Sequence, residues 1–180
     1  MFQSNKVVDD TVPLVEKPQD TRITCDELMQ GDCIVSGDLE KMGYYWNMSC
    51  LPQWKPRFCV VKGGYLWKYP HRHGTGFKGC PIPLEHVQYE IVDSVPERNV
   101  LKIYTLSKEW YFRFSNEHDL NHWIDCMKKE REMMIKVRMG HLHVDSITEK
   151  AMNIGDREYE KRLEHMKKQE PDVSQVPQLF

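Results

Sequence analysis

The sequence predicts a mainly β domain of seven short strands, closed by a C-terminal amphipathic helix. From residue 36 onward, short runs rich in β-branched and aromatic residues follow one another, separated by glycine and proline, as in an all-β domain. After residue 115 the apolar residues recur at helical intervals instead. Five tryptophans, eight tyrosines, six phenylalanines and a hydrophobic share of 40% supply enough apolar surface for a core.

The expected strands are bounded by turn-forming residues. They lie at residues 37–44, 55–61, 65–69, 79–84, 89–92, 100–105 and 110–114. Lys62-Gly63-Gly64 predicts a tight hairpin turn, because glycine adopts positive φ without steric cost. Residues 71–78 predict a longer loop, and residues 96–99 (PERN) predict another turn.

The closing helix has clear signals at both ends. Ser115 or Asn116 can cap it, and Glu117 and Asp119 suit the positive end of the helix dipole. Gly140 ends the run. The apolar stripe consists of Leu120, Trp123, Ile124, Met127, Met134 and Ile135. Such a stripe can cover the open corner between two short antiparallel sheets packed face to face.

Polar segments flank this domain on both sides. Residues 1–35 predict a mostly flexible N-terminal arm, with a short helix near residues 25–30. The β domain with its helix takes residues 36–140, and residues 141–180 predict a helical C-terminal extension and tail. We expect the helix of the extension at residues 148–170. Its apolar residues are too few for a core of their own: Ile154, Tyr159, Leu163 and Met166.

Positive charge is concentrated in one segment of a chain whose formal net charge is −2. From Lys41 through Leu84 there is no Asp or Glu. The lysines and arginines of this segment are Lys41, Lys55, Arg57, Lys62, Lys68, Arg72 and Lys78. Segregated charge of this kind favours a polyanion-binding face. A solvated surface that lacks acids is the alternative interpretation.

Several function classes find no support in the sequence. The six cysteines form no CxxC pair, so we expect no zinc site, and buried, reduced thiols such as Cys59 and Cys126 are typical of a cytoplasmic protein. No apolar window reaches membrane-spanning length, so any membrane contact is expected to be peripheral, on the cytoplasmic face. No phosphate-binding glycine loop, GxSxG elbow or HExxH motif occurs. We therefore expect no enzyme, with no catalytic residue, metal or cofactor.

Several segments resemble, in order, the strands and the closing helix of pleckstrin-homology (PH) domains. They are residues 36–43 (SGDLEKMG), 54–61 (WKPRFCVV), 65–69 (YLWKY), 81–84 (PIPL) and 111–115 (YFRFS), followed by Trp123 in the helix. The resemblance covers residues 36–139. It implies a bent seven-stranded sandwich, or partly open barrel, whose loops between strands 1–2, 3–4 and 6–7 surround a lipid-headgroup site.

The resemblance also implies a basic signature: a lysine, a variable loop and then Lys/Arg-x-Arg. Here this reads Lys41, thirteen residues, and Lys55-Pro56-Arg57. Residues 55 and 57 point to one face of a strand, so two cations beside Lys41 can share one phosphate, while Phe58 and Val60 point to the other face. We predict that the headgroup-binding residues are Lys41, Lys55 and Arg57, with Arg72 and Lys108 added from the loops.

The loop between the first two strands is rich in aromatic residues and uncharged. Trp46, Met48 and Leu51 in this loop predict insertion into a membrane, because aromatic side chains favour the bilayer interface. Packing of these side chains back onto the domain is the alternative, and it is the interpretation that we favour for Trp54.

The expected lipid depends on Pro70. PH domains that bind highly phosphorylated inositol lipids often carry a basic residue at this position, so Pro70 favours a simpler headgroup, such as phosphatidic acid or a singly phosphorylated phosphoinositide. The plan of one small PH domain with short tails is also similar to the acylated PH proteins of apicomplexan parasites. That resemblance implies recognition of phosphatidic acid on secretory organelles, although Phe2 departs from their N-terminal lipidation signal.

The sequence thus predicts a non-enzymatic membrane adaptor that binds an anionic phospholipid. A protein-interaction module with only non-specific membrane affinity is the alternative, because PH-like folds also bind peptides. A protein partner could then bind the C-terminal helical extension. Nucleic acid is not an expected partner, because it requires a broader charged face than one loop end provides.

Overall fold

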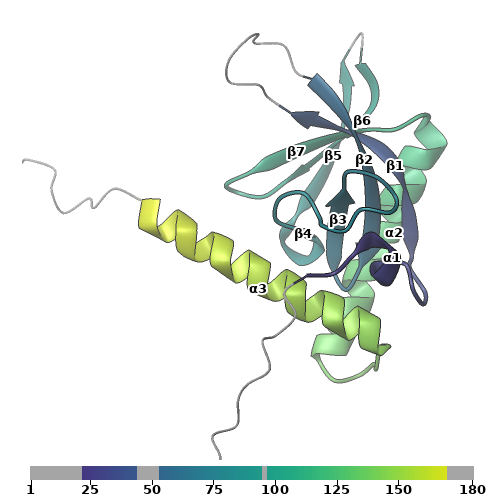
Figure 1. Ribbon diagram of the computed structural model, residues 1–180. Helices are drawn as coiled ribbons and strands as arrows, with labels where there is room; N and C mark the ends of the chain where they lie inside the picture. Colours follow the sequence, from purple (N-terminus) through teal and green to yellow (C-terminus); the bar gives the residue numbers. More distant parts are fainter. Residues whose placement is uncertain (1–21, 44–52, 95–96, 170–180) are drawn as a thin grey trace, which may run out of the picture.

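The computed structural model describes residues 22–43, 53–94 and 97–169 (Figure 1). Seven strands form one antiparallel sheet in the order β4-β3-β2-β1-β7-β6-β5. The strands are β1 (Val35–Gly43), β2 (Gln53–Lys62), β3 (Tyr65–Tyr69), β4 (Ile82–Pro83), β5 (Gln88–Ser94), β6 (Glu97–Tyr104) and β7 (Glu109–Arg113). The prediction of a mainly β fold with seven strands and a closing helix is confirmed.

The two expected sheets are the two halves of this one sheet. β1 pairs with β2 along its whole length, from Val35↔Val61 to Gly43↔Gln53. It pairs with β7 only at Glu40 and Lys41. The sheet can bend at this short junction, so the two halves face each other around an apolar interior, while β4 and β5 form the two ends of the strand order (Figure 1).

The fourth strand is shorter than expected. Only Ile82 and Pro83 pair with β3, whereas residues 79–81 lie outside the ladder. Gly79 has φ +67° and Pro81 has no N–H group, so neither residue suits a continuous strand. The segment that was expected to begin the strand is therefore a turn, and this turn lies beside the pocket described below.

α2 (Glu117–Arg138) closes the interior as expected. The side chain of Asn116 accepts a hydrogen bond from the backbone N–H of Asp119 at 2.8 Å and so caps the helix. Five residues of the predicted stripe are buried: Leu120, Trp123, Ile124, Met127 and Met134. The ring of Trp123 lies edge-on to that of Phe114, with the centroids 6.0 Å apart. Ile135 departs from the expectation because it lies at the edge of the stripe and is 39% exposed.

A second apolar cluster lies on the opposite, outer face of β2 and β3. Phe58, Val60 and Trp67 point outward there, and two further helices cover them: α1 (Cys25–Leu28) and α3 (Ser146–Gln169). Ile23, Cys25 and Leu28 are fully buried in this cluster, so residues 22–34 of the predicted arm include a segment packed on the domain. The rest of the arm, residues 1–21, lies outside the described residues.

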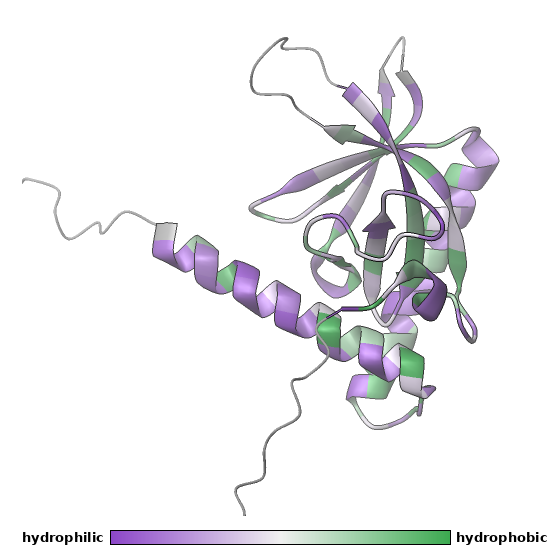
Figure 2. Cartoon of the chain, viewed as in Figure 1, coloured by the Kyte–Doolittle hydropathy of each residue, from purple (hydrophilic) through white to green (hydrophobic). Residues whose placement is uncertain are grey.

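The first half of α3 is held on this outer face, although the helix has no core of its own. Ala151 and Ile154 are buried in the outer cluster. Asp145 accepts hydrogen bonds from the N–H groups of Ile147 and Thr148 at 2.9 Å, so the helix begins at Ser146, two residues earlier than expected. The C-terminal end of α3 projects from the domain (Figure 1), and Figure 2 shows it as largely hydrophilic with isolated hydrophobic residues.

Candidate functional site

A basic pocket opens at the end of the bent sheet where β1 ends and β2 begins. Its volume is about 390 Å³. The lining includes six basic side chains: Lys41, Lys55, Arg57, Lys68, Lys78 and Lys108. Four of these, Lys41, Lys55, Arg57 and Lys108, belong to the predicted headgroup set. The structure therefore brings together cations from both halves of the sheet.

The basic side chains of the strands lie on the concave face of the sheet. Cys59 and Val61 point into the inner core, so Arg57 and Lys55, two and four residues before Cys59, share that face. In the same way Lys41 follows Leu39 on β1, and Lys68 follows Leu66 on β3. The expected alternation in β2 is confirmed, but the face that carries the cations is the inner one. Along each of these strands, the side chains on the inner face change from apolar in the core to cationic at the pocket.

The strand register places like charges opposite each other. Lys41 pairs directly with Lys55, and the next inward pair, Leu39 with Arg57, brings a third cation beside them. Like charges at directly opposed positions of a sheet lower its stability. A bound anion would remove this repulsion, so the register itself favours an anionic ligand.

Burial and mutual repulsion both act on these amines. Burial lowers the pKa of Lys41, and the charges of Lys108, Arg57 and Lys55 lower it further. Nζ of Lys41 donates to the carbonyl oxygen of Met42 at 3.1 Å, and Arg57 donates to that of Pro56 at 2.7 Å. Lysine and arginine have three and five N–H donors, so both can bind a phosphate oxygen without losing these bonds.

Lys68 is a residue of the pocket that sequence reasoning missed. Its side chain is 3% exposed, and Nζ donates to the carbonyl oxygen of Cys80 at 2.8 Å. Burial lowers its pKa from 10.5 to about 7, with smaller contributions from Lys41 and Lys108. Two signals could have found it: its place in the acid-free segment, and its alternation with the core residue Leu66.

Lys78 is the second missed residue, and it reaches the pocket from the loop after β3. The backbone N–H of Lys78 donates to the carbonyl oxygen of Lys68 at 2.6 Å. This bond draws the end of the loop to the strand that carries Lys68. The bond thereby places Lys68 and Lys78 next to each other in the lining of the pocket.

Glu109 is the one carboxylate among the described residues that line the pocket. It forms an ion pair with Lys102 at 2.9 Å and accepts a hydrogen bond from the hydroxyl of Tyr111 at 2.7 Å. The hydrogen bond from Lys102 is the main cause of its lowered pKa. Because its charge is paired in this way, it offsets the basic character of the pocket only in part.

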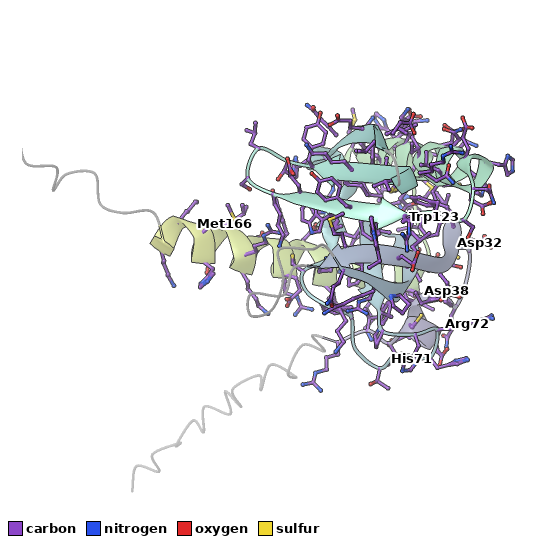
Figure 3. All side chains as sticks on the ribbon, turned by 90° about the horizontal axis from the view of Figure 1, so that it is seen from above. Asp32, Asp38, His71, Arg72, Trp123 and Met166 are labelled. Atoms are coloured by element: carbon purple, nitrogen blue, oxygen red, sulfur yellow. The ribbon has the colours of Figure 1, made fainter. Side chains whose placement is uncertain are left out.

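Arg72 does not line the pocket. Its loop is tied to α1 on the outer face of the sheet, where the N–H of Cys25 donates to the carbonyl oxygen of Gly74 at 2.9 Å and His73 pairs with Asp26 at 2.9 Å. Figure 3 shows Arg72 at the edge of the domain, on the opposite side from Met166. The structure thus separates Arg72 from the other four predicted residues.

The predicted insertion residues Trp46, Met48 and Leu51 lie outside the described residues. Trp54, the second residue of β2, packs on the domain as expected: the guanidinium of Arg113 lies 4.7 Å from the centroid of its ring. None of the described helices combines the length and the apolar character that a membrane span requires.

Comparisons with known proteins agree with this architecture. The family model described as PH domain matches residues 35–132, which is more than half of the chain. No curated protein sequence matches significantly. One similar solved structure is the human PH domain of pleckstrin homology domain-containing protein family A member 5, with 16% identity, 73% of this chain and 93% of that chain covered, and a TM-score of 0.48.

Another is the C-terminal PH domain of pleckstrin in complex with D-myo-Ins(1,2,3,5,6)P5. It shows 22% identity and a TM-score of 0.47, and the match covers 56% of this chain and 97% of that chain. The match of the family model, together with the seven-stranded sheet and its closing helix, identifies this chain as a member of the pleckstrin-homology (PH) domain family.

Proposed function

We propose that this PH domain binds the phosphate headgroup of an anionic phospholipid in the basic pocket, and thereby attaches the protein peripherally to a membrane. The observation that carries the proposal is the direct opposition of Lys41 and Lys55, with Arg57 beside them on the concave face. Membership of a family of lipid- and inositol-phosphate-binding modules supports it. A phosphate bound among these cations would relieve their repulsion through charge-assisted hydrogen bonds.

The magnitudes require a second contribution besides charge. Each lysine or arginine near an anionic surface contributes about 1 kcal/mol, so four of them give a Kd of about 1 mM. Insertion of one or two apolar side chains adds about 1.5–3 kcal/mol each and brings the Kd to about the micromolar range. We assign this role to the uncharged loop that carries Trp46, Met48 and Leu51.

The lipid that fits these features best is phosphatidic acid. Its phosphomonoester is compact and can be bound directly by Lys55 and Arg57. Its small headgroup also covers the acyl chains poorly, which favours insertion of an aromatic loop. Pro70 stands where a further basic residue would serve a multiply phosphorylated inositol. This proposal agrees with the resemblance to the acylated PH proteins of apicomplexan parasites.

The test compares two double charge reversals that change the net charge equally. In Lys55→Glu/Arg57→Glu the pocket is changed, whereas in Lys128→Glu/Lys129→Glu two exposed lysines of α2 are changed. We expect the first variant to lose co-sedimentation with phosphatidylcholine vesicles that contain phosphatidic acid, with an unchanged circular dichroism spectrum, and the second to bind. Binding that survives in the first variant, or that is lost equally in both, contradicts the proposed site.

The choice of lipid is tested at matched surface charge. Vesicles with phosphatidic acid should bind more protein than vesicles with phosphatidylserine of equal charge density, and added salt should weaken both. Equal binding to the two lipids would show that the pocket responds to charge alone. Efficient competition by soluble inositol phosphates would instead identify a phosphoinositide as the ligand.

A further inference from the structure

A further cation, carried by α3, lies beside the basic pocket and outside its lining. The guanidinium of Arg162 lies 5.4 Å from the centroid of the Trp110 ring, and Nζ of Lys108 lies 5.5 Å from the same centroid. Burial raises the pKa of the Cys80 thiol, the charge of Arg162 lowers it, and both Trp110 and Cys80 line the pocket. Arg162 lies beyond residues 35–132, the part of the chain that the PH family model covers.

The position of Arg162 follows from the way that α3 is fixed two turns earlier. Gly155 lies so close to the Tyr65 ring that a Cβ atom would overlap it. The Tyr65 hydroxyl donates to Asp156, which also accepts a hydrogen bond from Arg138 of α2 at 2.7 Å. These contacts hold α3 against β3 and α2, and the helix then carries Arg162 to the β6–β7 hairpin, which lies over α3 in Figure 1.

The tip of this hairpin presents an apolar side chain to solvent. The N–H of Thr105 donates to the carbonyl oxygen of Lys108 at 2.8 Å, which closes a turn with Leu106 and Ser107 at its tip. Leu106 is fully exposed, the most exposed large hydrophobic residue of the described ranges. Single exposed apolar residues are common on protein surfaces. Leu106 differs because it lies two residues from a lysine of the pocket.

The tip of the turn lies beside the pocket. Leu106 and Lys108 belong to the same tight turn, and Lys108 lines the pocket. A headgroup bound at Lys108 therefore brings the side chain of Leu106 to the membrane surface. Arg162, which lies over the same Trp110 ring as Lys108, then lies beside the same surface.

We propose that the tip of the β6–β7 hairpin and Arg162 of α3 form a second contact with the anionic bilayer beside the pocket. Leu106 enters the acyl-chain layer, and Arg162 binds the phosphate of a neighbouring lipid. This inference rests on the proposed function, and it makes the C-terminal extension part of the membrane-binding surface.

Two variants test the second contact, each with a matched control. Leu106→Ser is compared with Ile91→Ser, a half-exposed apolar residue of β5, and Arg162→Ala with Arg157→Ala on the same helix. For phosphatidylcholine vesicles with phosphatidic acid, we expect Leu106→Ser to weaken binding about tenfold and Arg162→Ala about fivefold. The controls should bind as the wild type does. Binding of glycerol 3-phosphate, followed by NMR, should be unchanged in all four variants because it requires the pocket alone.

The outcomes separate this inference from the proposed function. Unchanged vesicle binding of both test variants would overturn the second contact, as would an equal loss in the controls, and the pocket would stand in either case. A loss of glycerol 3-phosphate binding in the test variants would mean that these substitutions disturb the pocket. That result would also overturn the second contact. A wild-type protein that binds neither vesicles nor glycerol 3-phosphate would refute the proposed function and this inference together.

Discussion

Binding of a lipid phosphate should draw a proton onto Lys68. In the unliganded protein burial lowers the pKa of this amine to about 7, so Lys68 is partly neutral near neutral pH. Its neighbour across the β2–β3 pairing, Cys59, supplies no compensating charge, because burial raises the pKa of the thiol to about 12. A phosphate in the pocket stabilises the protonated amine and restores its pKa toward 10.5.

The magnitude follows from these two pKa values. At pH 8 about nine tenths of the unliganded Lys68 is neutral, so binding should take up about 0.9 proton, whereas at pH 6 it should take up about 0.1. The affinity should accordingly fall about tenfold between pH 6 and pH 8. The lipid phosphate contributes to both quantities with the opposite sign, because neighbouring cations favour its more highly charged form and release a proton. The comparison is therefore with Lys68→Met, which keeps the buried volume and removes the titrating amine.

Isothermal titration calorimetry in buffers of different ionisation enthalpy measures the proton uptake directly. The difference between the wild type and Lys68→Met at pH 8 should approach one proton. The unliganded proteins provide a second test, because between pH 7 and pH 10 the unfolded state binds a proton that folded Lys68 lacks. The unfolding free energy of the wild type should therefore rise with pH relative to Lys68→Met. Equal proton uptake by the two proteins would refute the assignment of Lys68 to the pocket.

Two substitutions test the packing that positions the pocket. Trp123→Ala removes the largest side chain of the α2 stripe and should lower the unfolding free energy by about 3–5 kcal/mol in denaturant titration, and a well-folded variant with lost lipid binding would contradict a core role. Gly155→Ala should destabilise the protein by about 1–3 kcal/mol, despite the helix propensity of alanine, because the new Cβ overlaps the Tyr65 ring. Gly76→Ala meets open space and should leave the melting temperature nearly unchanged, so equal melting temperatures of both alanine variants would count against the close packing of α3.

Local signals in the sequence predict most of the fold. β3 has the expected bounds, and α2 begins after Asn116, one of the two expected caps. These elements depend on alternation, turn residues and caps, which act over a few residues. β4 is shorter than expected because the proline and glycine content of residues 79–83 limits pairing more than the apolar residues favour it.

The sequence predicted four of the six cations that line the pocket. Lys41, Lys55 and Arg57 stand in a motif that the sequence shows directly. Lys68 was missed because a lysine between apolar strand residues looks like an outward-facing one until the bend of the sheet is known. Arg72 was placed in the site from its loop, but contacts of that loop with α1 hold it on the outer face.

Arg162 could not be assigned from sequence, because its place depends on packing far away along the chain. The segment around it is charged and helical, which by itself indicates a solvated helix. Only the contact of Gly155 with Tyr65 and the bonds of Asp156 fix where the helix runs. A family model that ends at residue 132 contains neither of these residues of α3, although it contains the ring that Arg162 covers.

The pocket and the core are parts of the same strands, and this couples binding to stability. Leu39 and Cys59 belong to the core, while Lys41 and Arg57, two residues away on each strand, line the pocket. The cations are therefore held by a rigid sheet, and little conformational entropy is lost when a ligand binds. The same rigidity prevents Lys41 and Lys55 from moving apart, so their repulsion remains in the unliganded fold. A headgroup that neutralises this repulsion binds the folded state alone, and its binding free energy adds to the stability of the domain.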